Sequence, residues 1–357
     1  MAGVLLLLLI AVGGWLFGLR RRLILAALAG AWGVIELAHL LSPGLGAFFG
    51  GTAQGWLVAG GAAAALLAYR AILGGLRSRA APDQPADGGQ TAGGLTDAEI
   101  DRYARHLVLR EIGGPGQMRL RDARVLVVGA GGLGAPVCLY LAGAGVGRIT
   151  VADDDHVSLS NLQRQVIFRS DQRGERKAVA AADAMAALNP QVAVTGLARR
   201  IADTDTGLIA EHDLVLDGTD SFAARAAINR ACVAAGVPLI AGAIAQWEGQ
   251  VTLYDPARGG PCLACLFPAA PAPGLAPPCA EAGVIGPLPG VVGSLMALEA
   301  VKHLTGIGDS GAGQGLRGRM LIFDGLYGES RMIATARRPD CPVCGSAHAP
   351  ETTGDAS

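Results

Sequence analysis

Two pairs of cysteines share the spacing Cys-x-x-Cys in the last third of the sequence, Cys262 with Cys265 and Cys341 with Cys344. Four thiolates supplied in this way suit a tetrahedral zinc ion with no open coordination position, which is the arrangement of a structural site. A redox dithiol is the alternative for either pair taken alone. We predict one structural Zn²⁺ that joins the end of the chain to the segment around Cys262.

A glycine-rich turn marks a second candidate site. Residues 129–134 (GAGGLG) follow the apolar segment 124–129 and open an apolar helical segment. Glycines permit close approach of the backbone to a ligand, and N–H groups at the start of a helix bind phosphate. Asp153 ends the next apolar segment, where a carboxylate binds ribose hydroxyls. The pattern indicates an adenine nucleotide, with NAD as the first candidate, bound by Gly129, Gly131, Gly132, Gly134 and Asp153.

Cationic side chains after Asp153 change that choice. The segment 158–165 (SLSNLQRQ) carries Asn161 and Arg164, and Lys177 opens the next helical segment. A triphosphate needs more cationic groups than a pyrophosphate bridge, because the charge that develops as it departs has to be stabilised. Each of these cations alone would also fit as a solvated surface charge. Together with the glycine turn, they favour ATP.

Two carboxylates follow a fourth apolar segment, in DLVLDGTDSF (213–222). A carboxylate at the end of a strand faces the nucleotide crevice, and Mg²⁺ prefers oxygen ligands. We expect Asp220 to bind Mg²⁺, whereas Asp217 could instead brace the loop.

Cys279 lies in the Pro- and Ala-rich segment 268–284, which has no apolar periodicity. Loops of this kind often carry function, so its thiol could act as a nucleophile, or it could be incidental. Cys138 and Cys232 lie in apolar helical segments and are expected in the core.

Short apolar segments typical of strands alternate with helical segments between residues 124 and 244. This alternation predicts an α/β fold with a doubly wound, mostly parallel, Rossmann-like sheet, in which ligands bind beyond the carboxyl ends of the strands. The strands that we expect are 124–129, 148–153, 191–197, 213–218 and 238–244.

The N-terminal region is different in composition. It accounts for much of the mean hydropathy of +0.39, and three apolar stretches approach the roughly 20 residues that a membrane-spanning helix needs. These stretches are Ala2–Leu19, Leu23–Leu41 and Gly46–Tyr69. We predict a transmembrane region of three helices at 1–76, a linker at 77–94, a catalytic domain at 95–345 and a disordered tail at 346–357.

Basic residues predict the orientation of these spans. Arg20–Arg22 lie between the first two stretches, and Arg70, Arg77 and Arg79 follow the third. Because basic residues stay in the cytoplasm, three spans place the catalytic domain on the cytoplasmic side of the inner membrane. The net charge of −1 excludes the strong overall charge of a nucleic-acid-binding protein.

The segments from 95 to 345 resemble the MoeB/ThiF/HesA family, whose members are related to ubiquitin-activating enzymes. The similar motifs keep their order along the chain: RYAR (102–105), GAGGLG, SLSNLQRQ, LDGTD (216–220), EGQVTLY (248–254), PCLACLFP (261–268), the segment 281–302 and CPVCG (341–345). The resemblance implies an antiparallel extension at the C-terminal side of the sheet.

The resemblance also implies an activity. The enzyme would use ATP and Mg²⁺ to adenylate the C-terminal glycine of a ubiquitin-fold sulfur carrier that ends in Gly-Gly, in the molybdopterin pathway or alternatively the thiamine pathway. It implies that Asp153 binds ribose, that Asp220 binds Mg²⁺, and that Asn161, Arg164 and Lys177 bind phosphates. Arg105 would reach the triphosphate of the other subunit of a homodimer, and Cys279 matches a cysteine that some relatives use covalently.

Several features depart from the family pattern. Ser221 replaces the usual Asn and His106 the usual Gln, and no sulfurtransferase domain follows Cys344, so sulfur would come from a separate sulfurtransferase or cysteine desulfurase. Two other functions remain open: an NAD-dependent oxidoreductase, and a non-catalytic membrane adaptor for a carrier. The nucleotide that raises the melting temperature distinguishes the first, and the presence of Arg164, Lys177 and Asp220 argues against the second.

Overall fold

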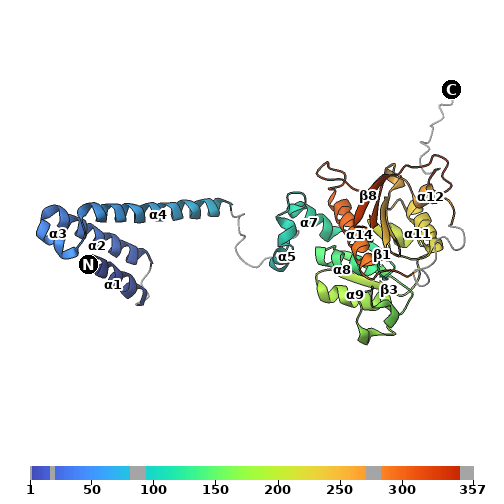
Figure 1. The fold of residues 1–357 in the computed structure, drawn as a ribbon, viewed down its shortest axis with the longest axis horizontal. Helices are drawn as coiled ribbons and strands as arrows, with labels where there is room; N and C mark the ends of the chain where they lie inside the picture. The colour runs from blue at the N-terminus through green and yellow to red at the C-terminus, as the bar shows by residue number, and fades with distance from the viewer. Residues whose placement is uncertain (1, 17–20, 81–93, 271–282, 346–357) are drawn as a thin grey trace, which may run out of the picture. The chain divides into compact units, whose positions relative to one another are not determined.

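A computed structural model describes residues 2–16, 21–80, 94–270 and 283–345. The chain divides into an N-terminal unit, Met1–Thr91, and a second unit, Ala92–Ser357 (Figure 1). The second unit contains the predicted catalytic domain and is called the catalytic unit below. Cys279 and the predicted tail lie outside the described residues, so the role of this cysteine stays a prediction.

The N-terminal unit is helical. It consists of α1 (Ala2–Leu16), α2 (Arg21–Leu41), α3 (Pro43–Phe49) and α4 (Ala53–Ala80). α2 and α4 pack through two tryptophans, since the Trp32 indole donates a hydrogen bond to the carbonyl of Trp56 over 3.1 Å. Many large apolar side chains point outward, including Leu40 and Phe48, which are 75% and 72% exposed. An apolar outer surface of this kind suits lipid better than water.

The structure corrects the prediction of three membrane spans. Among the described residues, one helix is long and apolar enough to cross a membrane, the part of α2 from Leu23 to Leu41. α1 has 15 residues, fewer than the roughly 20 that are needed. The third predicted span is interrupted between α3 and α4, where Gly50 and Gly51 have φ angles of 76° and 85°. The orientation predicted from three spans therefore loses its basis.

The catalytic unit is built on one mixed sheet of 8 strands in the order β3-β2-β1-β4-β5-β6-β7-β8. The strands are β1 (Arg124–Val128), β2 (Arg148–Ala152), β3 (Ala193–Leu197), β4 (Leu214–Asp217), β5 (Leu239–Ala245), β6 (Glu248–Tyr254), β7 (Arg319–Asp324) and β8 (Glu329–Ala334). β1–β5 are mutually parallel, and β6, β7 and β8 extend the sheet in antiparallel fashion. The predicted α/β class and the antiparallel extension are confirmed.

Helices cover both faces of the sheet (Figure 1). One core contains Leu141 of α8 (Gly134–Ala144), Met185 of α9 (Lys177–Leu188) and Met296 of α14 (Pro287–Thr305). The core on the opposite face contains Ile209 of α10 (Thr206–Ala210) and Ile228 of α11 (Phe222–Ala235). β1 and β4, buried between the two helical layers, are apolar apart from Arg124 at the start of β1 and Asp217 at the end of β4, because neither face meets water.

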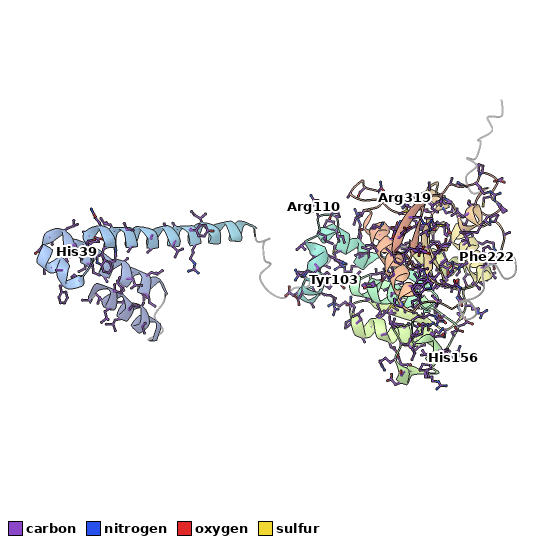
Figure 2. The ribbon with its side chains drawn as sticks, viewed as in Figure 1. His39, Tyr103, Arg110, His156, Phe222 and Arg319 are labelled. Atoms are coloured by element: carbon purple, nitrogen blue, oxygen red, sulfur yellow. The ribbon has the colours of Figure 1, made fainter. Side chains whose placement is uncertain are left out.

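Three short helices precede the sheet: α5 (Asp97–Arg102), α6 (Ala104–Leu107) and α7 (Gly113–Asp122). Thr96 and Glu99 form a capping box at the start of α5. Tyr103 lies between α5 and α6 (Figure 2), and its hydroxyl accepts a hydrogen bond of 2.8 Å from buried Asn189, which also donates to the carbonyl of Ala142. Since α8 ends at Ala144 and β2 begins at Arg148, these contacts lie at the edge of the sheet where the parallel strands begin.

Candidate nucleotide site and cysteine cluster

The glycine turn connects the end of β1 to the start of α8 in very little space. Gly129 has a φ of 89°, a left-handed conformation that favours glycine. A Cβ atom on Gly134 would lie 1.8 Å from the Gly129 carbonyl oxygen. Only glycine therefore allows the amino end of α8 to start directly above β1, where its free N–H groups can meet a phosphate.

Asp153 follows β2 and faces this turn. Its carboxylate accepts hydrogen bonds of 2.8 Å from the backbone N–H groups of Ala130 and Asp155. Burial raises the pKa of Asp153, although these N–H groups and the charge of Lys177 oppose the shift. The bond to Ala130 places the predicted ribose-binding carboxylate directly beside the predicted phosphate-binding loop.

The segment 158–165 folds back over the glycine turn. A Cβ atom on Gly132 would lie 3.5 Å from Cγ of Arg164 and 3.0 Å from Cβ of Pro289. The Arg164 guanidinium donates to the side-chain carbonyl of Asn161 over 3.0 Å. The structure therefore brings Asn161 and Arg164 to the glycine turn.

Lys177 is the first residue of α9 and is 3% exposed. Its ammonium group lies 2.9 Å from a carboxylate oxygen of Asp155, and its charge opposes the rise in the pKa of Asp153 that burial causes. A lysine buried beside a nucleotide loop is not a solvated surface charge. The sequence pattern did not indicate Asp155 as the partner of Lys177, although Asp153–Asp155 form an acidic run.

The two carboxylates after β4 play different parts. Asp217 is fully buried and accepts hydrogen bonds from the backbone N–H and hydroxyl of Thr219, at 2.8 and 2.7 Å. Burial raises the pKa of Asp217. Asp220 is exposed and makes no hydrogen bond or ion pair to other described residues. Asp217 therefore braces the loop, and Asp220 is free to bind a ligand. Ser221 caps α11 by accepting from the N–H of Ala224.

Arg105 lies on α6 and is exposed. The helix is held at the edge where the parallel strands begin, and its own glycine turn lies at the other edge. A strand of five residues separates the two edges by roughly 17 Å. The structure therefore does not bring Arg105 to the nucleotide residues of its own chain. His106 hydrogen-bonds Gln117, whose amide donates to the carbonyl of Ala144.

The four cysteines of the Cys-x-x-Cys pairs meet in one buried cluster. The Sγ–Sγ distances are 3.9 Å for Cys262–Cys265, 3.6 Å for Cys262–Cys341 and 3.4 Å for Cys265–Cys344. Tetrahedral zinc with Zn–S bonds of about 2.3 Å requires about 3.8 Å between sulfurs. Burial alone would raise the pKa of Cys341, but the N–H groups of Cys344 and Val343 outweigh burial and bring it to about 7. The donor set fits zinc.

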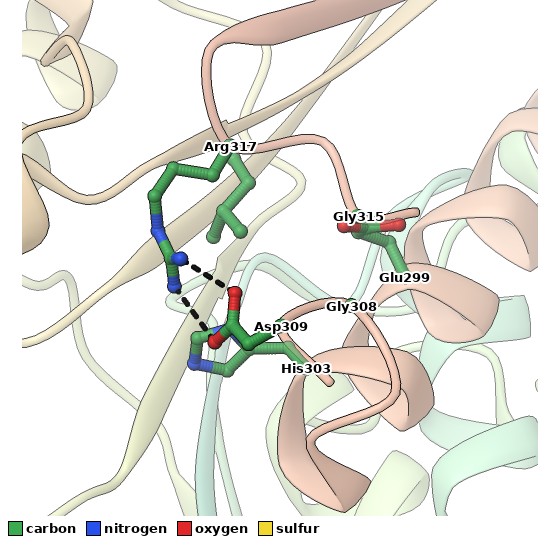
Figure 3. Close-up of a pocket in the computed structure, with 7 residues that line it drawn as sticks. Glu299, His303, Gly308, Asp309, Gly315 and Arg317 are labelled. Carbon is green, nitrogen blue, oxygen red and sulfur yellow. Dashed lines mark hydrogen bonds and ion pairs between the residues drawn. The ribbon is translucent and has the colours of Figure 1, made fainter. Parts of the chain in front are cut away.

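A cavity of about 200 Å³ lies away from these residues (Figure 3). It is lined by Glu299 and His303 of α14, by Leu253, and by Arg317, which pairs with Asp309. Leu253 pairs with Ile240 near the beginning of β5. This cavity is therefore at the edge opposite the glycine turn, and it is not the nucleotide site.

Relatives of known name share this catalytic unit. The chain is 47% identical over 255 residues to a sulfur carrier protein adenylyltransferase from Thermus thermophilus, covering 70% of this chain and 92% of the relative. It is 44% identical over 252 residues to molybdopterin-synthase adenylyltransferase from Escherichia coli, covering 70% and 98%. It is also 45% identical to a SAMP-activating enzyme E1 from Haloferax volcanii, over 252 residues and 91% of that protein.

Solved structures share the fold. The microcin C7 biosynthetic enzyme MccB, in complex with N-formylated MccA, superimposes with a TM-score of 0.60 at 24% identity, over 68% of this chain and 75% of that one. Residues 103–343 match the ThiF family. This match includes the glycine turn, the residues gathered around it and three of the four clustered cysteines, with Cys344 directly after it. The chain therefore belongs to the ThiF family.

Proposed function

We propose that the catalytic unit is an ATP-dependent adenylyltransferase that activates the C-terminal carboxylate of a ubiquitin-fold sulfur carrier. The observation that carries the proposal is that two cations and a free carboxylate lie around one glycine turn. Arg164 lies over Gly132, Lys177 acts on Asp153, which bonds Ala130, and Asp220 follows Thr219, whose N–H lies beside Gly129. A pyrophosphate-binding NAD site needs neither of these cations. The names of the relatives support the same reaction, since two of them are adenylyltransferases.

The residues suggest how the reaction proceeds. The amino end of α8 binds phosphate, and Asp153 orients the ribose. The carrier's carboxylate attacks the α-phosphorus, and the bond to pyrophosphate breaks, which leaves an acyl-adenylate. Arg164 and Lys177 stabilise the charge that moves onto pyrophosphate. Mg²⁺ on Asp220 would neutralise charge on the phosphates.

We place the carrier in the molybdopterin pathway first, because of the Escherichia coli relative's name, with the thiamine pathway as the alternative. The sulfur would come from a separate sulfurtransferase or cysteine desulfurase. ATP–pyrophosphate exchange with each carrier of the same organism tests the proposal. Exchange with none of them would contradict it.

The first prediction concerns Asp220. Asp220→Asn should reduce carrier-dependent ATP–pyrophosphate exchange by ~100-fold or more, because an amide holds Mg²⁺ poorly and charge on the phosphates goes uncompensated. Asp183→Asn, an exposed carboxylate on α9, is the matched control and should exchange at the wild-type rate. Wild-type exchange by Asp220→Asn would remove the metal assignment.

We also propose that the enzyme is a homodimer in which Arg105 completes the partner's nucleotide site. Arg105 is too far from its own glycine turn, yet an arginine held at that edge can reach a second subunit across a two-fold axis. α8 and α14 lie side by side and expose Tyr140 by 60% and Leu298 by 56%. Large apolar side chains on one face are typical of a subunit interface.

Complementation tests the shared site. Arg105→Ala and Asp220→Asn should each be inactive as homodimers. A mixed dimer, isolated through two different affinity tags, should show about half of the wild-type activity, because a two-fold dimer then contains one complete site. An inactive mixed dimer, or full activity of Arg105→Ala alone, would show that each chain has a complete site of its own.

A structural zinc ion on the four cysteines is the third part of the proposal. We expect one Zn²⁺ per chain, lost in Cys344→Ser together with thermal stability, because three thiolates bind it less tightly and the chain end is released. Cys138→Ala, in the core of α8, should lower stability and keep the metal. Metal analysis distinguishes the two, and a full equivalent of zinc in the Cys341→Ser, Cys344→Ser double variant would exclude the site.

Finally, we propose that α2 attaches the enzyme to the inner membrane, with the catalytic unit in the cytoplasm where ATP is available. Val34→Arg with Leu37→Arg should release the chain from membranes at alkaline pH, since each charge at the centre of a span costs about 3 kcal/mol. Val179→Arg with Leu188→Arg, on exposed positions of α9, should leave it attached. A reporter fused after Ser357 that is active only outside the cytoplasm would contradict the orientation.

A further inference from the structure

The turn between β5 and β6 has an unusual backbone. Gln246 has a φ of 49°, and it is the one residue other than glycine with a positive φ among those that the structure describes. A conformation of this kind costs free energy in a residue with a side chain, and it persists where surrounding contacts require it. The contacts that hold this turn in its conformation therefore indicate its structural role.

Two neighbouring segments are held by the turn. The carbonyl of Gln246 accepts a hydrogen bond of 3.2 Å from the N–H of Ile285, and Gln246 forms a parallel bridge with Val284. The carbonyl of Trp247 accepts a hydrogen bond of 2.8 Å from the N–H of Gly325, in the turn between β7 and β8. The turn thus joins the segment that leads into α14 to the second hairpin of the sheet.

Its position places it near the reaction. Asp217, the last residue of β4, pairs with Ala241, and β5 continues for four more residues to Ala245. These residues carry the turn roughly 13 Å beyond the end of β4, on the side of the sheet where the glycine turn and Asp220 lie. The amino end of α14 contacts both sides: Pro289 lies against Gly132, and Val292 against Gly249 of β6.

Apolar side chains are exposed at this place. Trp247 is 42% exposed, and Leu326 and Tyr327 in the adjacent turn are 56% and 76% exposed. The second turn is fixed, because the N–H groups of Leu326 and Tyr327 donate to the nearly buried carboxylate of Asp324 over 2.9 and 3.1 Å. These three side chains are held by rigid turns and not by a flexible loop, which suits the positioning of a substrate.

We propose that Trp247 is a substrate-binding residue, and that its indole packs against the C-terminal tail of the carrier on the way to the α-phosphate. The inference rests on the proposed function. A tail that ends in Gly-Gly has no side chains to grip, but its flat peptide groups can lie against an aromatic face. Leu326 and Tyr327 contact the carrier just before the tail. The strained turn at Gln246 sets the direction in which Trp247 points.

Steady-state kinetics of the full-length enzyme test this role. Trp247→Ala should raise the KM for the carrier about tenfold, the effect of losing roughly 1.4 kcal/mol of binding. The KM for ATP and the melting-temperature rise with ATP and Mg²⁺ should not change. Trp247→Phe should restore most of the affinity, because a ring remains. Leu188→Ala is the control, because Leu188 is an apolar side chain of α9 that is similarly exposed, at 43%. Its KM for the carrier should equal that of the wild type.

Fluorescence gives a second measurement. Trp247 is the one tryptophan between residues 92 and 357, so the difference in emission between wild type and Trp247→Phe reports on this position. The carrier should change that difference spectrum, and a carrier lacking its last two glycines should change it less. If the wild type is active and Trp247→Ala has an unchanged KM for the carrier, the role proposed for Trp247 is wrong and the proposed function stands. A wild type inactive with every carrier would instead overturn the proposed function.

Discussion

The contact between Gly129 and Gly134 is the constraint on which the rest of the catalytic unit depends. With no Cβ on Gly134, α8 starts within van der Waals contact of the end of β1. Because of that contact, the free N–H groups of α8 point to the carboxyl edge of the sheet. The other residues of the candidate site must lie close to this helix end to contact the same ligand. Asp153 is held there by the hydrogen bond that its carboxylate accepts from the N–H of Ala130, and Arg164 lies over Gly132.

Two sets of structural contacts anchor the chain away from the carboxyl edge of the sheet. At the edge where the strands begin, buried Asn189 joins Tyr103 to the end of α8 and so fixes α5 and α6. Beside α11, the four cysteines draw the end of the chain against the segment after β6. In both places buried side chains contact one another: Asn189 bonds Tyr103 and Ala142, and the four cysteines form one cluster. At the carboxyl edge, Asp220 has no hydrogen-bond or ion-pair partner among the described residues and is therefore available to a ligand.

The N-terminal unit shows where sequence patterns mislead. Apolar composition alone suggested three spans, but helix length depends on where the backbone turns, and Gly50 and Gly51 turn it inside the third apolar stretch. The first stretch forms a helix of 15 residues within the part that is described. Hydropathy reports the solvent that a segment prefers, whereas a span needs roughly 20 apolar residues within one uninterrupted helix. α4 is 28 residues long, but it includes Arg70, Arg77 and Arg79, so its length alone does not make it a span.

The sequence by itself determined the alternation of strands and helices, the glycine turn, the capping box at Thr96 and the chemical types of the site residues, because these follow from local periodicity, backbone sterics and ligand preference. Only the tertiary structure decided which carboxylate braces the loop and which is free, that Asp155 pairs with Lys177, that Arg105 lies at the far edge of its own sheet, and that Trp247 is exposed beyond the carboxyl end of β4. Each of these depends on residues distant in the chain being brought together by packing, and the local sequence carries no signal for such distances.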